Sequence, residues 1–116
     1  MSVKSKSYEM VENLRLGLDK IKDDERIIGY ILRDAKSASI DIKDPSKIID
    51  YAALSSTALE SGENVSETFG LGHVYSVVVE GKDVKVLSMS IGDSRVSVFM
   101  RRDVDHEKVC KNLHLK

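Results

Sequence analysis

The sequence predicts a layered α/β sandwich in which helices cover a five-stranded antiparallel sheet. Two observations carry this prediction. Apolar residues recur at helical spacing in separate segments, and five strand-like runs are joined mainly by short turns. The predicted order is helix, two strands, helix, three strands, helix, so the longest helix links a hairpin to a three-stranded meander. Because apolar stripes on helices must be buried, the helices are expected to cover the faces of the sheet.

Length and composition narrow the class of protein. The 116 residues suit a single domain over 1–116, within which residues 1–6 are expected to be disordered. Hydrophobic residues make up 41% of the chain and aromatic residues only 5%, which predicts an aliphatic core. The net charge of −1 lacks the basic excess of a dedicated nucleic-acid binder. One cysteine, no signal peptide and no run of roughly 20 apolar residues together predict a cytoplasmic protein without a membrane span.

The first part of the chain is predicted to form a helix and a hairpin. The helix is expected to begin at Ser7, and Gly17 weakens it by about 1 kcal/mol relative to Ala. A buried strand is expected over residues 26–33, where Gly29 marks a bulge or a close backbone approach. A half-exposed strand follows over residues 38–43. The apolar face of the helix consists of residues three and four apart: Met10, Val11, Leu14, Leu18 and Ile21.

The longest predicted helix runs from Asp44 to Gly70. Asp44 is a suitable N-cap because its carboxylate can accept a hydrogen bond from the first turn, and Pro45 suits the first helical position. One stripe of this helix is apolar, namely Ile48, Ile49, Ala52, Ala53 and Leu59. The other residues of the face are small and let another backbone come close: Ser55, Ser56, Ala58, Ser61 and Gly62. The residues leave open whether the chain's own sheet, a second copy or a different protein approaches this surface.

Three strands are expected after the helix, over residues 73–80, 84–91 and 94–102. Gly92 and Asp93 match a two-residue type II′ turn between the last two strands. The serines of these strands are interpreted as solvent-facing: Ser88, Ser90, Ser94 and Ser97. A last short helix, capped by Asp103 or Asp105, is expected to turn Val109, Cys110 and Leu113 toward the protein.

Residue types needed for catalysis or metal binding are not brought together by their spacing. The sequence has no glycine-rich phosphate loop and no dinucleotide fingerprint. His106 and Cys110 lie four residues apart on the predicted last helix, but without further ligands nearby they are expected to pack and not to bind a metal. We therefore expect no catalytic residue, no metal, no cofactor and no enzymatic activity.

Three stretches resemble the roadblock (dynein light chain roadblock-type) family over nearly the whole chain. ERIIGYILRDAKSASI, residues 25–40, resembles the family's first hairpin, although Ala35-Lys36-Ser37 stands where that turn usually holds a glycine. Residues 44–72 resemble the family's long central helix, which has small residues in its middle and glycine at its C-terminal end. Residues 73–109 resemble the meander and short last helix. The likeness is to single-domain archaeal and bacterial members, described as regulators of Ras-like GTPases; longin and profilin-like domains share the layering but usually differ in element order.

This resemblance implies a non-catalytic dimer, with itself or with a related roadblock protein, that binds a small Ras-like GTPase. The central helix and the strand after it would form the two-fold interface, comprising Tyr51, Leu54, Ser55, Ala58, Gly62, Val74, Tyr75, Ser76, Val77, Val78 and Val79. Exposed positions on the helix would contact the GTPase: Asp50, Ser56, Thr57 and Glu60. Residues 74–79 are uncharged, and an exposed edge strand of this kind promotes aggregation unless it is paired.

Other interpretations remain open at this point. The main alternative function is a structural adaptor that scaffolds a larger complex without regulating a GTPase. A small-ligand sensor would need a cavity, which an aliphatic core with few polar groups disfavours. The strand over residues 73–80 would also be satisfied inside the sheet of a monomer, with the long helix merely covering it.

Overall fold

The computed structural model describes the backbone of residues 3–113 and the side chains of residues 12–113. The helices are α1 (Val3–Ile21), α2 (Ile48–Phe69) and α3 (His106–Asn112), with a 3-10 turn η1 (Pro45–Lys47) directly before α2. The strands are β1 (Ile27–Arg33), β2 (Ala38–Ile42), β3 (Ser76–Glu80), β4 (Val84–Ile91) and β5 (Ser94–Arg101). This order of elements is the predicted one.

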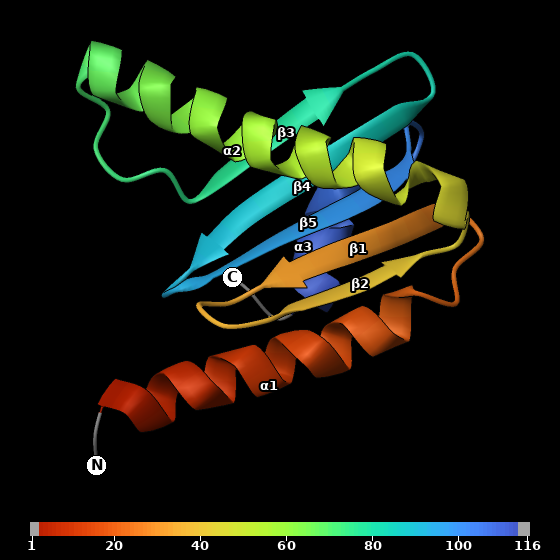
Figure 1. The fold of residues 1–116 in the computed structure, drawn as a ribbon, viewed down its shortest axis with the longest axis horizontal. Helices are drawn as coiled ribbons and strands as arrows, with labels where there is room; N and C mark the ends of the chain where they lie inside the picture. Colours follow the sequence, from red (N-terminus) through yellow and green to blue (C-terminus); the bar gives the residue numbers. More distant parts are fainter. Residues whose placement is uncertain (1–2, 114–116) are drawn as a thin grey trace.

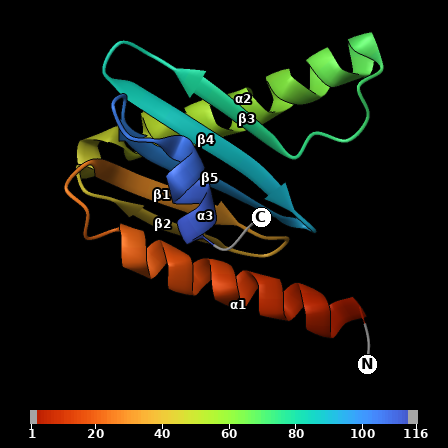
Figure 2. The same cartoon turned by 180° about the vertical axis from the view of Figure 1, so that it is seen from behind.

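The five strands form one antiparallel sheet with the order β2-β1-β5-β4-β3. Helix α2 crosses one face of this sheet, and α1 and α3 lie on the other face (Figures 1 and 2). The predicted layered α/β sandwich is therefore confirmed. The hairpin β1–β2 joins the meander through β5, so the two chain segments separated by α2 become neighbours in the sheet. No helix in the described part of the chain is long and apolar enough to cross a membrane.

The two faces of the sheet carry cores of different size. On the α1 and α3 side the core is large and aliphatic, with Leu14, Leu18, Val98 and Met100 among its most buried members. On the α2 side the hydrophobic core cluster is smaller, and its buried members are Ile31, Ile42, Val86 and Phe99. Tyr51 of α2 stacks on Phe99 there, with ring centroids 4.6 Å apart. The smaller core leaves part of α2 free for other contacts.

Helix α1 begins earlier than predicted, at Val3 instead of Ser7, so residues 3–6 already belong to it. Leu14, Leu18 and Ile21 are buried as expected, while the side chains of Met10 and Val11 lie outside the described residues. Gly17 has a role that sequence reasoning missed. A Cβ on Gly17 would lie 2.8 Å from the Cα of Leu113 and 3.0 Å from the carbonyl oxygen of Asn112. The glycine therefore lets α1 and the end of α3 touch through their backbones.

Gly29 is both the bulge and the close approach that its position in β1 predicted. The register between β1 and β5 shifts between Ile27 and Gly29. A Cβ at Gly29 would collide with the carbonyl oxygen of Asp41 and lie 2.7 Å from the Cα of Ile42. The backbone of β2 therefore fills the space that any side chain would need.

The turn between β1 and β2 is organised by Asp34 in the absence of a glycine. Its carboxylate accepts hydrogen bonds from the backbone N–H groups of Lys36 and Ser37, at 2.9 and 2.8 Å, and from the Ser37 hydroxyl. These bonds favour the ionised carboxylate and hold the pKa of Asp34 below its ordinary value. An Asx-type turn of this kind supplies the reversal that glycine supplies elsewhere.

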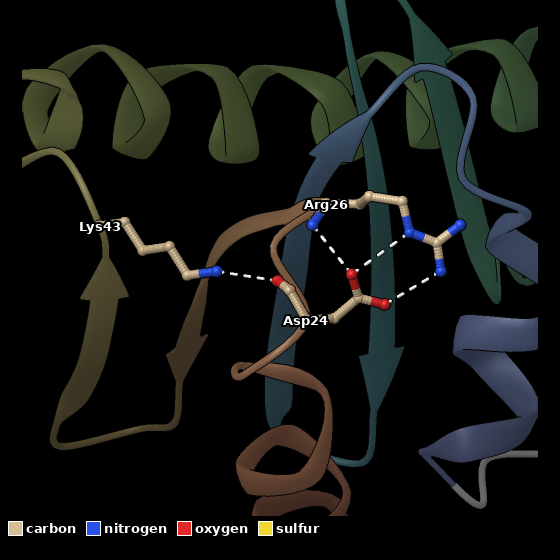
Figure 3. A network of polar contacts seen from close by, with 3 residues as sticks. All are labelled: Asp24, Arg26 and Lys43. Carbon is tan, nitrogen blue, oxygen red and sulfur yellow. Dashed lines mark hydrogen bonds and ion pairs between the residues drawn. The ribbon is translucent and has the colours of Figure 1, made fainter.

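The connection from α1 to β1 is fixed by a small polar network (Figure 3). Asp24 accepts hydrogen bonds from the backbone N–H and the guanidinium of Arg26, and the ion pair spans 3.0 Å. The Arg26 side-chain bonds, together with its backbone N–H, lower the pKa of Asp24. Lys43, just after β2, donates to the Asp24 carbonyl oxygen at 2.8 Å. The network thereby connects this exposed loop to the end of β2, at the open end of the hairpin.

Both ends of the long helical segment are as predicted, but its first turn is a 3-10 turn. Asp44 caps η1 by accepting hydrogen bonds from the Ser46 N–H at 3.1 Å and the Ser46 hydroxyl at 2.7 Å. The Ser46 hydroxyl and N–H also lower the pKa of the Asp44 carboxyl. Gly70 ends α2 in the left-handed conformation, with φ of +66°. Within the apolar stripe of the sequence, Leu59 is buried and Ile48 and Ala52 pack against the core, whereas Ile49 and Ala53 are exposed, Ile49 by 82%.

The serines of the meander were predicted to face solvent, and this prediction is wrong. Ser88, Ser94 and Ser97 are buried, and Ser90 is half-buried. The hydroxyls of Ser88 and Ser97, which lie opposite each other on β4 and β5, are 2.7 Å apart. Each hydroxyl satisfies the other beneath α2, which explains why short polar side chains are accepted there.

Helix α3 closes the other face. Asp105, one of the two predicted caps, accepts from the Glu107 N–H at 2.9 Å. Val109 and Leu113 are buried as predicted, and the Cys110 thiol lies 3.9 Å from the Met89 sulfur in the aliphatic core. His106 contacts Lys85 instead of Cys110, with 3.3 Å between Nδ1 and Nζ.

Candidate functional site

Strand β3 is a free edge of the sheet. It pairs only with β4, through Ser76–Met89 at one end and Glu80–Lys85 at the other. Tyr75 accepts a hydrogen bond from the Ser90 N–H, and Gly81 donates to Val84. In an antiparallel ladder, successive residues point their N–H and C=O groups to opposite sides of the strand. Since Tyr75 and Gly81 point theirs toward β4, the N–H and C=O groups of Ser76, Val78 and Glu80 point away from the sheet. The interpretation that this strand lies inside a monomer's sheet is therefore wrong.

An open apolar groove lies between α2 and this free edge. Its volume is about 750 Å³, and we call it the α2–β3 groove. Its lining includes large apolar side chains that are exposed: Val65 (52%), Leu71 (69%), Tyr75 (73%) and Val79 (40%). His73 packs edge-on against Tyr75 at the rim, with ring centroids 4.6 Å apart. Exposed apolar surface beside unpaired strand groups is characteristic of an interaction site.

Small residues of α2 form the floor of the groove. Ala58 is buried, and Gly62 lies so close to β3 that a Cβ there would collide with a methyl group of Val77. Ser66 is also buried, and its hydroxyl donates a hydrogen bond to the Gly72 carbonyl oxygen. The small side chains of α2 thus allow the helix to pack closely against β3 of the same chain.

The predicted interface residues divide into three groups in the structure. Most of them line the α2–β3 groove, namely Leu54, Ala58, Gly62, Val74, Tyr75, Ser76, Val77 and Val79. Tyr51 and Ser55 instead contact the chain's own sheet, Tyr51 through Phe99 and Ser55 as a buried residue. These two positions lie on the side of α2 that covers the smaller core and are not among the residues that line the groove. Val78 packs against the core on the opposite face.

The predicted GTPase-contact positions also separate. Asp50, Thr57 and Glu60 are exposed on α2, with Thr57 at the border of the groove. Ser56 is half-buried and not exposed as expected, and its hydroxyl accepts a hydrogen bond from the Arg33 guanidinium at 2.8 Å. The exposed side of α2 is acidic, since Asp50, Glu60 and Glu67 are all exposed there.

Sequence reasoning missed two contributors to this region. Val65 and Leu71 are exposed apolar residues that extend the groove beyond the predicted positions. Val65 lies on α2 and Leu71 in the loop after it, and both line the groove because the chain returns after Gly70 to place β3 beside α2. Of the residues that the structure describes, no three His, Cys, Asp or Glu side chains cluster as metal ligands would.

Comparison with known proteins identifies the fold. No protein-family model matches the sequence, and no curated protein matches it either. The structure is similar to the crystal structure of a Roadblock/LC7 domain from Streptomyces avermitilis, with a TM-score of 0.69, 18% identity, and coverage of 86% of this chain and 88% of that one. It is also similar to MglC from Myxococcus xanthus, with a TM-score of 0.54, 19% identity, and coverage of 89% and 92%. The chain therefore has the fold that its sequence resembled.

Proposed function

We propose that this chain is a non-catalytic member of the roadblock family, a cytoplasmic dimer that binds a small Ras-like GTPase and influences its nucleotide state. The observation that carries the proposal is the free β3 edge beside the α2–β3 groove. The roadblock fold supports it, because the sequence resemblance to that family implies both the dimer and the GTPase.

In the proposed dimer, β3 of one copy pairs antiparallel with β3 of the other across a two-fold axis. A register centred on Val78 places Ser76 opposite the partner's Glu80 and satisfies the outward N–H and C=O groups. It also keeps the two Glu80 side chains at opposite ends, which avoids the repulsion of like charges placed directly opposite each other. The partner's α2 would then cover the apolar side chains of the groove.

Substitution of Val79 by lysine tests the dimer. Val79 is 40% exposed in the groove, and a charge there should prevent a second copy from burying it. Ile40→Lys is the matched control, since Ile40 is 46% exposed on the opposite edge strand. Sedimentation at micromolar concentration should give a dimer for the wild type and for Ile40→Lys, and a monomer for Val79→Lys. A wild-type monomer would overturn the dimer and most of the functional proposal.

The exposed acidic side of α2 is the proposed GTPase contact. Mixing the purified protein with Ras-like GTPases of the same organism, loaded with GDP or a GTP analogue, should give a co-sedimenting complex. Glu60→Lys should weaken that complex, whereas Glu12→Lys, an equal charge reversal on exposed α1, should not. A dimer that binds no such GTPase in either nucleotide state would instead favour a scaffold subunit of a larger complex.

A further inference from the structure

Two arginines lie opposite each other on the face of the sheet that α2 covers. Arg33 of β1 and Arg95 of β5 are direct partners in the antiparallel register. Both line one small cavity of about 20 Å³ together with the serines Ser55, Ser56 and Ser97. Like charges placed directly opposite on neighbouring strands destabilise a sheet. An anion bound beside the pair would relieve this repulsion.

The described residues supply little negative charge beside the pair. Arg33 is half-buried, and its guanidinium donates only to neutral groups, the Ser56 hydroxyl at 2.8 Å and the Ala52 carbonyl oxygen at 3.4 Å. Among residues 12–113, no carboxylate oxygen lies within 4.0 Å of its side-chain nitrogens. Arginine is rarely withdrawn from water without an anionic partner. Arg33 thus has no carboxylate partner among these residues.

Arg95 is only weakly neutralised. Its Nη2 is 3.9 Å from a carboxylate oxygen of Glu63, and both side chains are about half exposed. An exposed pair at that distance contributes little. Because this contact is long, Arg95 is free to take up another anion beside Arg33.

The hydroxyls around the cavity differ in what they can still donate. Ser55 donates to the Ala52 carbonyl oxygen at 2.9 Å, and Ser97 is paired with Ser88. The Ser56 oxygen accepts from Arg33, so its own proton remains available. The available donors are therefore two guanidinium groups and one hydroxyl, which come from β1, β5 and α2.

We propose that Arg33, Arg95 and Ser56 bind a tetrahedral oxyanion of the phosphate type, at a site separate from the α2–β3 groove. A planar carboxylate is satisfied by one bidentate arginine, whereas a phosphate offers oxygens to donors from several directions. The cavity itself has room for about one water molecule. Binding therefore requires Arg95 to swing outward, which its exposure and its single long contact allow.

Titration with inorganic phosphate, followed by NMR of the 15N-labelled full chain at constant pH and ionic strength, tests this site. Saturable shifts are expected at the amides of residues 33, 56 and 95. Arg95→Gln should weaken phosphate binding by at least about tenfold, since it removes a charge-assisted donor. Arg101→Gln is the matched control, because it removes the same charge from the same face of β5 at the strand's other end and should leave phosphate binding unchanged.

Arg33→Gln provides a second variant with the same expected loss, its folding checked by circular dichroism because Arg33 also contacts α2. The proposal is overturned if chloride or acetate produces the same shifts, or if Arg95→Gln binds phosphate as the wild type does. A further titration with O-phosphoserine separates two sources of the ligand. Tighter binding than inorganic phosphate indicates a phosphorylated side chain, and equal or weaker binding indicates the free ion.

Discussion

At the scale of single residues, Gly17 shows two physical effects acting in opposite directions. In an isolated helix the glycine costs about 1 kcal/mol relative to alanine. In the folded chain the Leu113 backbone occupies the place of a Cβ, at 2.8 Å from where it would lie. Backbone yields less readily than the end of a flexible side chain, so the contact outweighs the helix propensity.

Gly17→Ala should therefore lower the free energy of unfolding by up to about 2 kcal/mol, the cost of overpacking exceeding the gain in helix propensity. Urea denaturation measures this change. Asn13→Ala is the control, because Asn13 is exposed on the same helix and its substitution should stabilise α1 by a few tenths of a kcal/mol. If Gly17→Ala were stabilising, α1 and α3 would not be in backbone contact.

Asp34 makes stability depend on pH at the residue scale. Its backbone and hydroxyl partners lower its pKa in the folded state below the ordinary value of 3.8. The stabilisation is therefore fully present above the unfolded pKa and is lost as the pH falls through the lower folded value. The difference in unfolding free energy between the wild type and Asp34→Ala should be constant above about pH 5 and shrink on acidification below it. Urea unfolding at a series of pH values from neutral to acidic measures this difference in free energy. A difference that grew below pH 3.8 would contradict a lowered pKa of Asp34 in the folded state.

At the scale of elements, β3 combines an inward ladder to β4 with an outward row of unpaired groups. Tyr75 and Gly81 bond to β4, and Ser76, Val78 and Glu80 alternate with the bonded positions. The side chains alternate as well, with Val77 and Val79 turned toward the groove and Val78 toward the larger core. One short strand thus belongs to the core and to a free surface at once.

Ser76→Pro should remove an outward N–H and leave the ladder to β4 intact, because proline is tolerated at the first residue of a strand. We expect a folded monomer by sedimentation and circular dichroism, where the wild type is a dimer. Val77→Pro, one residue further, removes an inward donor and should destabilise the fold itself. A Ser76→Pro protein that remained dimeric would show that the copies associate by some other surface than this edge.

At the scale of the whole molecule, the sheet has two free edges, β2 and β3, but only one of them lies beside the groove. The β2 edge is exposed too, and Ile40 and Ile42 carry its outward N–H groups, since Lys43 bonds back to Ile28. Helix α2 is placed asymmetrically over the sheet, toward the β3 side (Figure 1). This asymmetry makes β3 the favoured surface for a second copy.

Hydrogen exchange should therefore depend on protein concentration at one edge alone. At high dilution the outward amides of both edges should exchange rapidly, because they are bonded only to water. At concentrations that favour the dimer, the amides of Ser76, Val78 and Glu80 should become protected, whereas those of Ile40 and Ile42 should not. Equal protection at the two edges, or none, would contradict association through β3.

The order of elements, the turns and the caps follow from the sequence alone. These depend on local chemistry: Asp44 and Asp105 cap because their carboxylates reach nearby N–H groups, and Gly70 ends α2 because it adopts a positive φ. The resemblance also pointed to β3, which the structure places at an edge of the sheet, and to most of the residues that line the groove. Periodicity in the meander likewise marked the strands, since alternation needs no knowledge of what lies opposite.

The neighbour that each face meets depends on the three-dimensional packing of the chain. Tyr51 and Ser55 were expected to meet a second copy, and the rotation of α2 places them against the chain's own sheet. Ser88 and Ser97 looked exposed until strand register set their hydroxyls together. The register of β1 on β5 likewise set Arg33 opposite Arg95. The physical reason is the same in each case: local sequence fixes periodicity, whereas the partner across a sheet or beneath a helix is fixed by residues far away in the chain.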